Sequence, residues 1–518
     1  MSYIGLDVGL SGCKACLFAE DDGRLLAGSY CEYQTESPQE GWRELNPALV
    51  WRSVQQVLAG LAESAAGDPP KALAVSSHGE SAVPVSAKGE DLANAITPLD
   101  QRISDPLASR PGTGLAELWG DGLSMEEVVR ITGQPPHPSY TLPRILWLRR
   151  HKPEIVKRAW KFLCFQEYIL YRLGAKKPAT SFSQAARTWA FDVHQKVWSD
   201  KILSTCGLRA DLFADAVPAA TVVGEMDPKT AKELKLPGGI KLLTGGHDQA
   251  CGALGTGVIR SGLAVDSTGT VECITPSFAK PLPPGTVLKY NFCNSPHVVD
   301  GLYVTFAWNI TGGSLLKWYR DRLGGVEAKM LSDNGLDFYT ENLRELPGGP
   351  TGLLVLPHFA GSGTPWFWQD SYGLILGLDF ETDKKRLLKA FLEGITFEMK
   401  YNIELLQQEG LRIETFFCIG GGAKSQEWLQ IKADIFGLPV VRTEVTEGAC
   451  LGCAMMCAHA LQRVSYDQIT QGWRAKSTMY EPRTAEARRY AEYFDLYRRM
   501  QETVRPLQQD LHQLRRRL

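Results

Sequence analysis

The chain has 518 residues, a formal net charge of -2, 44% hydrophobic residues and 22% charged residues. This composition is ordinary for a globular enzyme and excludes a disordered or fibrous chain. The near-neutral charge gives no support for a nucleic-acid or membrane-surface partner. The length exceeds what one hydrophobic core usually supports, so we expect two domains with a ligand cleft between them.

The N-terminus carries charges where a signal peptide would need an unbroken apolar core, and no later run is long enough to span a bilayer. We therefore expect a cytoplasmic protein.

The 12 cysteines follow no framework spacing, which indicates reduced core residues. Zinc binding is not expected at the two Cys-x-x-Cys pairs. The pair at Cys13 lies on a predicted strand, where an offset of three points the sulfurs to opposite faces. The pair at Cys450 lies on a helix whose small residues favour close packing.

The first predicted element is a β-hairpin. Residues 3–7 form a strand, Ser11-Gly12 turn the chain, and residues 13–18 run back. A glycine-rich hairpin tip exposes successive backbone N–H groups, which can form a concave site for phosphate oxygens. The chain has neither a P-loop sequence nor a dinucleotide-binding glycine motif, so a phosphate site must be of another kind.

Helical periodicity at residues 46–62 and 140–173 follows the hairpin, so strands alternate with helices. Residues 240–243 then predict a buried strand, and the glycines at 245 and 246 remove side chains where backbone or ligand must come close. Asp248 would lie at the carboxyl end of this strand, where open α/β sheets bind ligands. Considered without its neighbours, Asp248 fits equally well as a turn residue whose side chain forms hydrogen bonds within its own loop.

A second hairpin of related design spans residues 262–274, with an apolar strand, Asp266, small polar residues, Gly269 and another apolar strand. This repetition indicates an internal duplication, and we place the domain boundary in the glycine-rich stretch 255–262. Two such hairpins, one in each domain, would hold a polyphosphate from both sides.

The second half continues with helices and strands. A long helix is predicted at residues 386–408, a buried strand at 415–419, a glycine turn at 420–426, and then a helix that stops at Gly437. The C-terminal segment is helical and Arg-rich, with a break at Pro506. We expect it to form a solvated surface or an oligomer contact.

In these motifs the chain resembles the FGGY carbohydrate kinases over roughly residues 1–460. The resemblance implies an α/β fold with two actin-like, ribonuclease-H-like ATPase domains and a catalytic cleft between them. The domains would be residues 1–257 and 258–465, with a helical extension at 466–518. The shared motifs are, in chain order, Asp7-x-Gly9-x-Ser11-x-x-Lys14, Asp100-Gln-Arg102, Phe191-Asp192 with Trp198, Gly246-His-Asp248-Gln249, Gly269-Thr270, Gly312-Gly313 with Lys317-Trp318, Gly421-Gly422 with Gln426, Ala433-Asp434, and Glu447.

The resemblance also implies the chemistry, which is transfer of the γ-phosphate of ATP to a sugar hydroxyl. Asp248 would be the general base that takes the hydroxyl proton. The expected cofactors are ATP and Mg²⁺, and Asp7 would hold the metal through water. The residues expected around ATP are Gly9, Ser11, Lys14, Gly269, Thr270, Gly313, Lys317, Gly421, Gly422 and Gln426.

On the sugar side, residues 76–81 align with the loop that holds substrate hydroxyls in the family. Gly79 and Glu80 fall at the contact position, and Gln249 beside the base is a second hydroxyl partner. A carboxylate can accept two hydroxyl hydrogen bonds, as polyol recognition requires, whereas xylulose kinases typically place His at this point. His78 is expected to pack the loop.

The expected substrate is a small ketose or polyol, with L-fuculose first and xylulose as the alternative. Leu10 stands where the family usually has Thr, and the lost hydroxyl would cost about 1 kcal/mol in ground-state binding. A catalytically weak sugar- and nucleotide-binding sensor is therefore an alternative from another class, against which Asp248 argues. The expected partners are the small-molecule sugar and a second copy of the chain in a homodimer, with no nucleic acid and no membrane.

Overall fold

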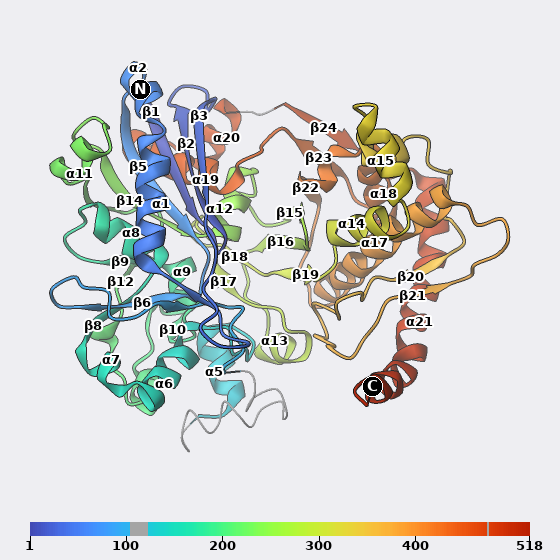
Figure 1. Ribbon diagram of the computed structural model, residues 1–518, viewed down its shortest axis with the longest axis horizontal. Helices are drawn as coiled ribbons and strands as arrows, with labels where there is room; N and C mark the ends of the chain where they lie inside the picture. The colour runs from blue at the N-terminus through green and yellow to red at the C-terminus, as the bar shows by residue number, and fades with distance from the viewer. Residues whose placement is uncertain (104–122, 474–475, 518) are drawn as a thin grey trace.

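Two mixed β-sheets organise the molecule, one in each half of the chain (Figure 1). The computed structural model describes residues 1–103, 123–473 and 476–517. In sheet order, the first sheet consists of β13 (Val222–Glu225), β14 (Lys241–His247), β5 (Pro70–Ser77), β1 (Ser2–Val8), β2 (Gly12–Ala19) and β3 (Leu25–Glu32).

The second sheet repeats the topology of the first. Each sheet has an antiparallel hairpin, a third antiparallel strand beside it, two parallel strands on the other side and an antiparallel edge strand. This repetition confirms the predicted duplication and the α/β fold class. The second sheet consists of β17 (Ser295–Pro296), β18 (Tyr303–Val304), β16 (Glu272–Phe278), β15 (Leu263–Thr268), β22 (Thr415–Gly420), β23 (Val440–Thr443) and β24 (Ser477–Tyr480), with β19 (Ala307–Asn309) also paired to β16.

Helices cover both faces of the first sheet, which explains why its central strands are nearly continuous apolar runs. One face packs against α1 (Pro47–Ala59) and α8 (Phe165–Leu173). The other face packs against α12 (Asp248–Gly255) and α19 (Gly448–Gln462). Cys13 and Cys16 lie in these two different cores, as the strand offset predicts.

Helix α19 follows β23 of the second sheet in sequence but packs on β1 and β5 of the first, beside α12 (Figure 1). The backbone of α19 lies in direct contact with the backbones of α12 and β1. A methyl group on Gly452 would overlap the carbonyl oxygen of Cys251, and one on Gly5 would overlap that of Cys450. The predicted close packing of this helix is confirmed, and all twelve cysteines are free thiols.

The predicted helical region at 140–173 is interrupted by a strand. It contains α6 (Thr141–His151), α7 (Pro153–Arg158), β8 (Ala159–Cys164) and α8, and β8 pairs with β6 (Ala82–Ser86). The prediction is therefore wrong over residues 159–164. The buried run Phe162-Leu163-Cys164 fits strand as well as helix, and its pairing with distant β6 decides the outcome.

The C-terminal segment belongs to the core of the second half. Strand β24 extends the second sheet, and α21 (Thr484–Arg515) packs on α17 (Lys384–Gln408) and α18 (Gln426–Phe436). The expectation of a solvated surface is wrong for one side of α21, because Tyr490, Phe494, Tyr497 and Met500 form a buried stripe at helical spacing. The alternative, an oligomer contact, stays a prediction. Pro506 lies inside this helix and does not end it.

Within the described ranges, no helix is both long and apolar enough to cross a membrane. The remaining elements are β4 (Glu44–Leu45), α2 (Ala62–Gly67), β7 (Ala95–Ile96), α5 (Met125–Thr132), β9 (Ala179–Ser181), α9 (Phe182–Ala186), β10 (Phe191–Asp192), β11 (Val197–Trp198), α10 (Asp200–Thr205), β12 (Asp215–Val217), α11 (Pro228–Glu233), α13 (Pro284–Tyr290), α14 (Gly313–Arg322), α15 (Gly325–Asp333), α16 (Phe338–Leu343), β20 (Leu354–Leu356), β21 (Leu374–Leu376), α20 (Tyr466–Gly472) and the 3₁₀ turns Ala210–Leu212 and Gly422–Lys424.

Candidate active site

The three parallel strands of the first sheet end together. Val8 of β1 and His247 of β14 both lie opposite Ser77 of β5. Because carboxyl ends of parallel strands share one edge, the loops that follow them meet there. The structure therefore brings together Asp7, Gly9, Ser11, Gly79, Glu80, Asp248 and Gln249.

Asp248 is the first residue of α12, and its side chain is 29% exposed, so a ligand can reach it. Burial raises its pKa to about 7, with added contributions from the charges of Asp7 and Glu80. The backbone N–H of Gln249 donates to Asp248 Oδ1 at 2.6 Å. A carboxylate with a pKa near neutrality is suited to accept a proton from a hydroxyl group.

His247 is an uncharged neighbour of Asp248. Burial and the charge of Arg187 lower the pKa of His247 to about 3, so its ring stays neutral. Its Nε2 lies 3.4 Å from Asp248 Oδ1. The histidine therefore does not supply a positive charge that would hold Asp248 in the ionised form.

Asp7 provides the oxygen donor on which the magnesium expectation rests. Burial raises the pKa of Asp7 to about 6, although the hydrogen bond from Ser76 Oγ, at 2.8 Å, lowers it. Asp7 and Asp248 thus form a carboxylate-rich region where added positive charge is favourable. Among the described residues, no three His, Cys, Asp or Glu side chains form a protein-only metal site. One carboxylate completed by water and phosphate oxygens is the arrangement that Mg²⁺ usually prefers.

The hairpin of the first half differs in two details from the expected phosphate site. Lys14 Nζ donates to Glu447 Oε2 at 2.7 Å, so a phosphate would have to take over this ammonium group from Glu447. The N–H of Gly9 donates to the carbonyl of Gly12 at 2.9 Å. Gly9 therefore contributes space rather than a hydrogen-bond donor.

A cavity of about 880 Å³ lies at the carboxyl ends of β15 and β22 in the second half. Every residue of this half predicted to contact ATP lines it, namely Gly269, Thr270, Gly313, Lys317, Gly421, Gly422 and Gln426. Sequence reasoning missed Leu316, Tyr339 and Leu343 on its wall, because α14 and α16 carry no motif at these positions. The predicted residues thus meet in one cavity large enough for a nucleotide.

A smaller cavity of about 100 Å³ lies between the two halves. Arg187 is its main charged group. Arg187 Nε donates to Glu80 Oε1 at 2.7 Å, Nη1 donates to Gln134 Oε1 at 2.8 Å, and the guanidinium lies over the ring of Tyr140. Other lining residues are His137, Ser139, Asn291, Cys293, Phe306 and Trp308. Sequence reasoning missed Arg187, although an arginine between Ala186 and Trp189 in an apolar stretch is a usable signal.

Glu80 is ionised and held by Arg187. Burial by itself raises the pKa of this carboxyl, but the charge of Arg187, the hydrogen bond from Arg187 and the charge of Arg144 together lower it below its usual value. Its backbone has a φ of 73°, a left-handed conformation that a non-glycine residue keeps only where its surroundings fix it. The predicted hydroxyl ligand is therefore already one half of an ion pair, and the guanidinium becomes a second candidate on the sugar side.

Several buried polar atoms beside this ion pair have no hydrogen-bond partner among the described residues. They are His78 Nε2, Ser81 Oγ, Gln184 Oε1 and His247 Nδ1. Buried polar atoms normally have partners, so these atoms are candidates for hydrogen bonds to water or to a ligand. His78 Nδ1 bonds the carbonyl of Val8 at 3.1 Å and the ring packs on Phe165, which agrees with the predicted loop packing.

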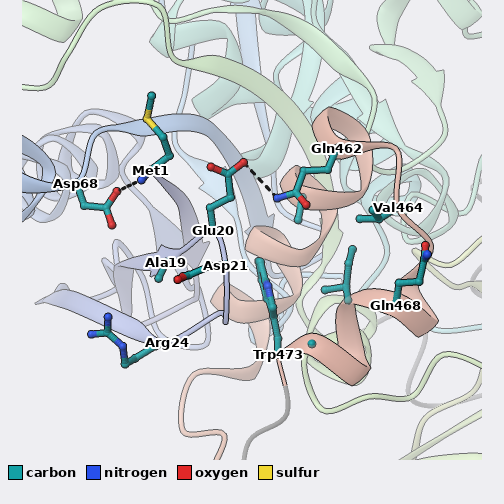
Figure 2. Close-up of a pocket in the computed structure, with 13 residues that line it drawn as sticks. Met1, Ala19, Glu20, Asp21, Arg24, Asp68, Gln462, Val464, Gln468 and Trp473 are labelled. Atoms are coloured by element: carbon teal, nitrogen blue, oxygen red, sulfur yellow. Dashed lines mark hydrogen bonds and ion pairs between the residues drawn. The ribbon is translucent and has the colours of Figure 1, made fainter.

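Two other features lie apart from this site. Asp100 and Arg102 form an ion pair at 2.8 Å that holds their own loop against Glu44. A cavity of about 580 Å³ lies where β1 begins, at the opposite end of the first sheet (Figure 2). There the Met1 ammonium pairs with Asp68, and Gln462 donates to Glu20. Glu20 also pairs with Lys71, and Arg24 pairs with Asp22.

Comparison with known proteins finds relatives over the whole length of the chain. The xylulose kinase of Bacillus subtilis (strain 168) is 29% identical over 523 residues and covers 100% of both chains. The gluconokinase of Bacillus licheniformis is 25% identical, covering 95% of this chain and 94% of its own. The crystal structure of xylulose kinase from Rhodospirillum rubrum shares the fold with a TM-score of 0.85, at 24% identity, over 98% of this chain and 100% of that one.

Family profiles cover both halves of the chain. The N-terminal domain of the FGGY family of carbohydrate kinases matches residues 2–255, and the C-terminal domain of the same family matches residues 264–461. The two predicted phosphate hairpins, the candidate base and the larger cavity all lie within these matches. The chain belongs to the FGGY family of carbohydrate kinases.

Proposed function

We propose that this carbohydrate kinase transfers the γ-phosphate of ATP to a hydroxyl group of a small sugar, with a xylulose-like ketose as the first candidate. The observation that carries the proposal is the position and the raised pKa of Asp248. Helix α12, which begins at Asp248, contacts β14 of the first sheet and β16 of the second.

The choice of sugar rests on the relatives. Those reported above are named xylulose kinase and gluconokinase, so they support the xylulose alternative better than L-fuculose, which was the first expectation. A polyol-binding site needs several hydrogen-bonding groups in fixed positions. Arg187, Glu80 and the unpartnered polar atoms around them supply such groups.

The proposed step is a proton transfer coupled to attack on phosphorus. Asp248 accepts the proton of the sugar hydroxyl as its oxygen attacks the γ-phosphate, and ADP leaves. Mg²⁺ held at Asp7 would neutralise phosphate charge. Gly269 and Thr270 border the cavity where the phosphates would lie, and the two halves would close to exclude water, which is a competing acceptor.

The test is ADP release over a panel of ketoses, aldoses, polyols and sugar acids. We expect xylulose or a close ketose to give the highest turnover. Asp248→Asn should reduce kcat on that sugar about a hundredfold or more, since it removes the base. Asp333→Asn, an exposed aspartate on α15, is the matched control and should keep the parent rate.

Each other outcome has a defined meaning. A full rate for Asp248→Asn would show that Asp248 is not the base. Binding of ATP and sugar without ADP release would favour the sensor alternative suggested by Leu10. A homodimer stays a prediction, and sedimentation velocity of the full chain tests it.

A further inference from the structure

Lys432 lies in the core of the second half and does not touch the cavity. Its side chain is 1% exposed, and its ammonium group uses all three donors. Lys432 Nζ donates to Asp266 Oδ2 at 2.5 Å, to Thr268 Oγ1 at 2.8 Å and to Glu272 Oε1 at 2.8 Å. A buried ammonium is tolerated only when it is paired in this way.

The bonded oxygens lie directly beneath the hairpin that borders the nucleotide cavity. Thr268 and Glu272 are opposite each other at the last pair before the tip, which contains Gly269 and Thr270. Gly422 is pressed against Thr268, since a methyl group on this glycine would lie 2.7 Å from Thr268 Cβ. Lys432 itself belongs to α18, so its ammonium group connects this helix to the hairpin. Because Gly422 packs on Thr268, the glycine turn is held at the same place.

Helix α18 extends this connection to a further wall residue. Its Trp428 lines the same cavity, and Lys432 Nζ lies 4.9 Å from the centre of the Trp428 ring. The indole Nε1 donates to Thr396 Oγ1 of α17 at 3.2 Å. A displacement of Lys432 would therefore reach both the hairpin and the helix that carries Gln426.

Lys432, Asp266 and Glu272 form a buried cluster. Its charges do not balance if both Asp266 and Glu272 are ionised. One cation would then face two carboxylates in a site without solvent. Asp266 Oδ1 and Glu272 Oε2 are also buried without a hydrogen-bond partner among the described residues. A single proton between these two oxygens satisfies both of them and makes the cluster neutral.

The neighbouring groups agree with this assignment. Burial raises the pKa of Glu272, and the charge of Asp266 adds to this effect, while Lys432 opposes it. The Cys418 thiol of β22 donates to Asp266 Oδ2 at 3.5 Å, so Asp266 accepts two of these hydrogen bonds and Glu272 accepts one. This geometry makes Glu272 the better place for the proton.

We propose that Lys432, held by Asp266 and Glu272 with one proton between their two free oxygens, positions the phosphate-side hairpin 268–272 and α18 for nucleotide binding. These are positioning residues, because none of the three lines the cavity. The proposal rests on the proposed function for the identity of the ligand. It predicts that the cluster controls the affinity for nucleotide and leaves the affinity for sugar unchanged.

The test compares two isosteric variants of the full chain by calorimetric titration with ADP. Glu272→Gln keeps a donor toward Asp266 and an acceptor for Lys432, so it mimics the protonated acid. Asp266→Asn combined with Glu272→Gln removes both acids that can balance Lys432. We expect this double variant to weaken ADP binding about tenfold more than Glu272→Gln alone does, because an unpaired buried charge is the larger defect.

A third variant separates positioning from general stability. Lys432→Met should weaken ADP binding and raise KM for ATP, with KM for the sugar unchanged. Lys389→Met is the matched control, since Lys389 is also buried in this half and lies 3.2 Å from Glu393, and it is not part of the cavity. It should lower the melting temperature without changing ADP affinity.

Three results would overturn the proposal. The first is equal ADP affinity for Glu272→Gln and for the double variant that also carries Asp266→Asn. The second is equal loss of ADP affinity in Lys389→Met and Lys432→Met, and the third is a rise of both Michaelis constants in step. ADP titration needs no sugar. A chain that binds ADP but phosphorylates no sugar would therefore contradict the proposed function alone.

Discussion

At the scale of single residues, the environment of Asp248 decides its chemistry. An aspartate in water is ionised at neutral pH and is too weak a base for a sugar hydroxyl. Burial, with the charges of Asp7 and Glu80, raises the pKa of Asp248 to about 7. The neutral ring of His247 does not reverse this effect. The carboxylate is therefore a stronger base than an exposed aspartate.

This pKa predicts an acid limb in the pH profile. Asp248 must be deprotonated to accept the proton, so kcat/KM for the sugar should fall as the pH drops through about 7 and should level off above it. Initial rates between pH 5.5 and 8.5 measure this limb, and near-ultraviolet circular dichroism at each pH excludes unfolding as its cause. A flat profile over this range would contradict the assignment of Asp248 as a base with a raised pKa.

At the scale of elements, the contact between α12 and α19 positions the base. Asp248 is the first residue of α12, so the packing of this helix sets where the carboxylate lies. Gly452 and Gly255 allow the two helices to meet at backbone distance. The buried cysteines of α19 fill the surrounding core as small apolar side chains.

Gly452→Ala tests this contact. The added methyl group would overlap the carbonyl oxygen of Cys251, so we expect a loss of about 1–3 kcal/mol in the free energy of unfolding. We also expect a fall in kcat, because α12 must shift. Urea denaturation and steady-state rates measure both effects. Gly325→Ala is the control, since its methyl group meets open space in α15. Equal stability of the two variants would show that the helices separate freely.

At the scale of the whole molecule, the two halves share one hydrophobic core. One face of the first sheet is covered by α12 and by α19, and α19 follows the second sheet in sequence. Tyr3 and Leu243 pack in the same core as Met456. The N-terminal half alone would leave the part of this face that α19 covers exposed to water.

Residues 1–257 expressed alone should therefore lack a cooperative unfolding transition. The exposed face would bind a hydrophobic dye and favour aggregation. Thermal unfolding followed by near-ultraviolet circular dichroism measures the transition, with the full chain as the reference. A sharp transition for the fragment would show that α19 is dispensable for the first half.

Local signals in the sequence were sufficient to predict most of the fold and the positions of the candidate site residues along the chain. The hairpin at 3–18, the strand before Asp248 and the glycine turn at 420–426 each depend on a few adjacent residues, and the structure has all three. The strand at 159–164 was missed because its partner β6 is distant in sequence. The buried apolar stripe of α21 was not predicted, because the many arginines of this segment indicated a solvated surface.

The sequence by itself determined which chemical groups are present and at which strand ends they lie, because turns and periodicity are encoded within short segments. Only the tertiary structure decided that Glu80 pairs with Arg187, that Lys432 lies beneath the phosphate-side hairpin and that α19 crosses to the first sheet. It also set the pKa of Asp248. These properties depend on burial and on charges brought together from distant parts of the chain, which no local pattern records.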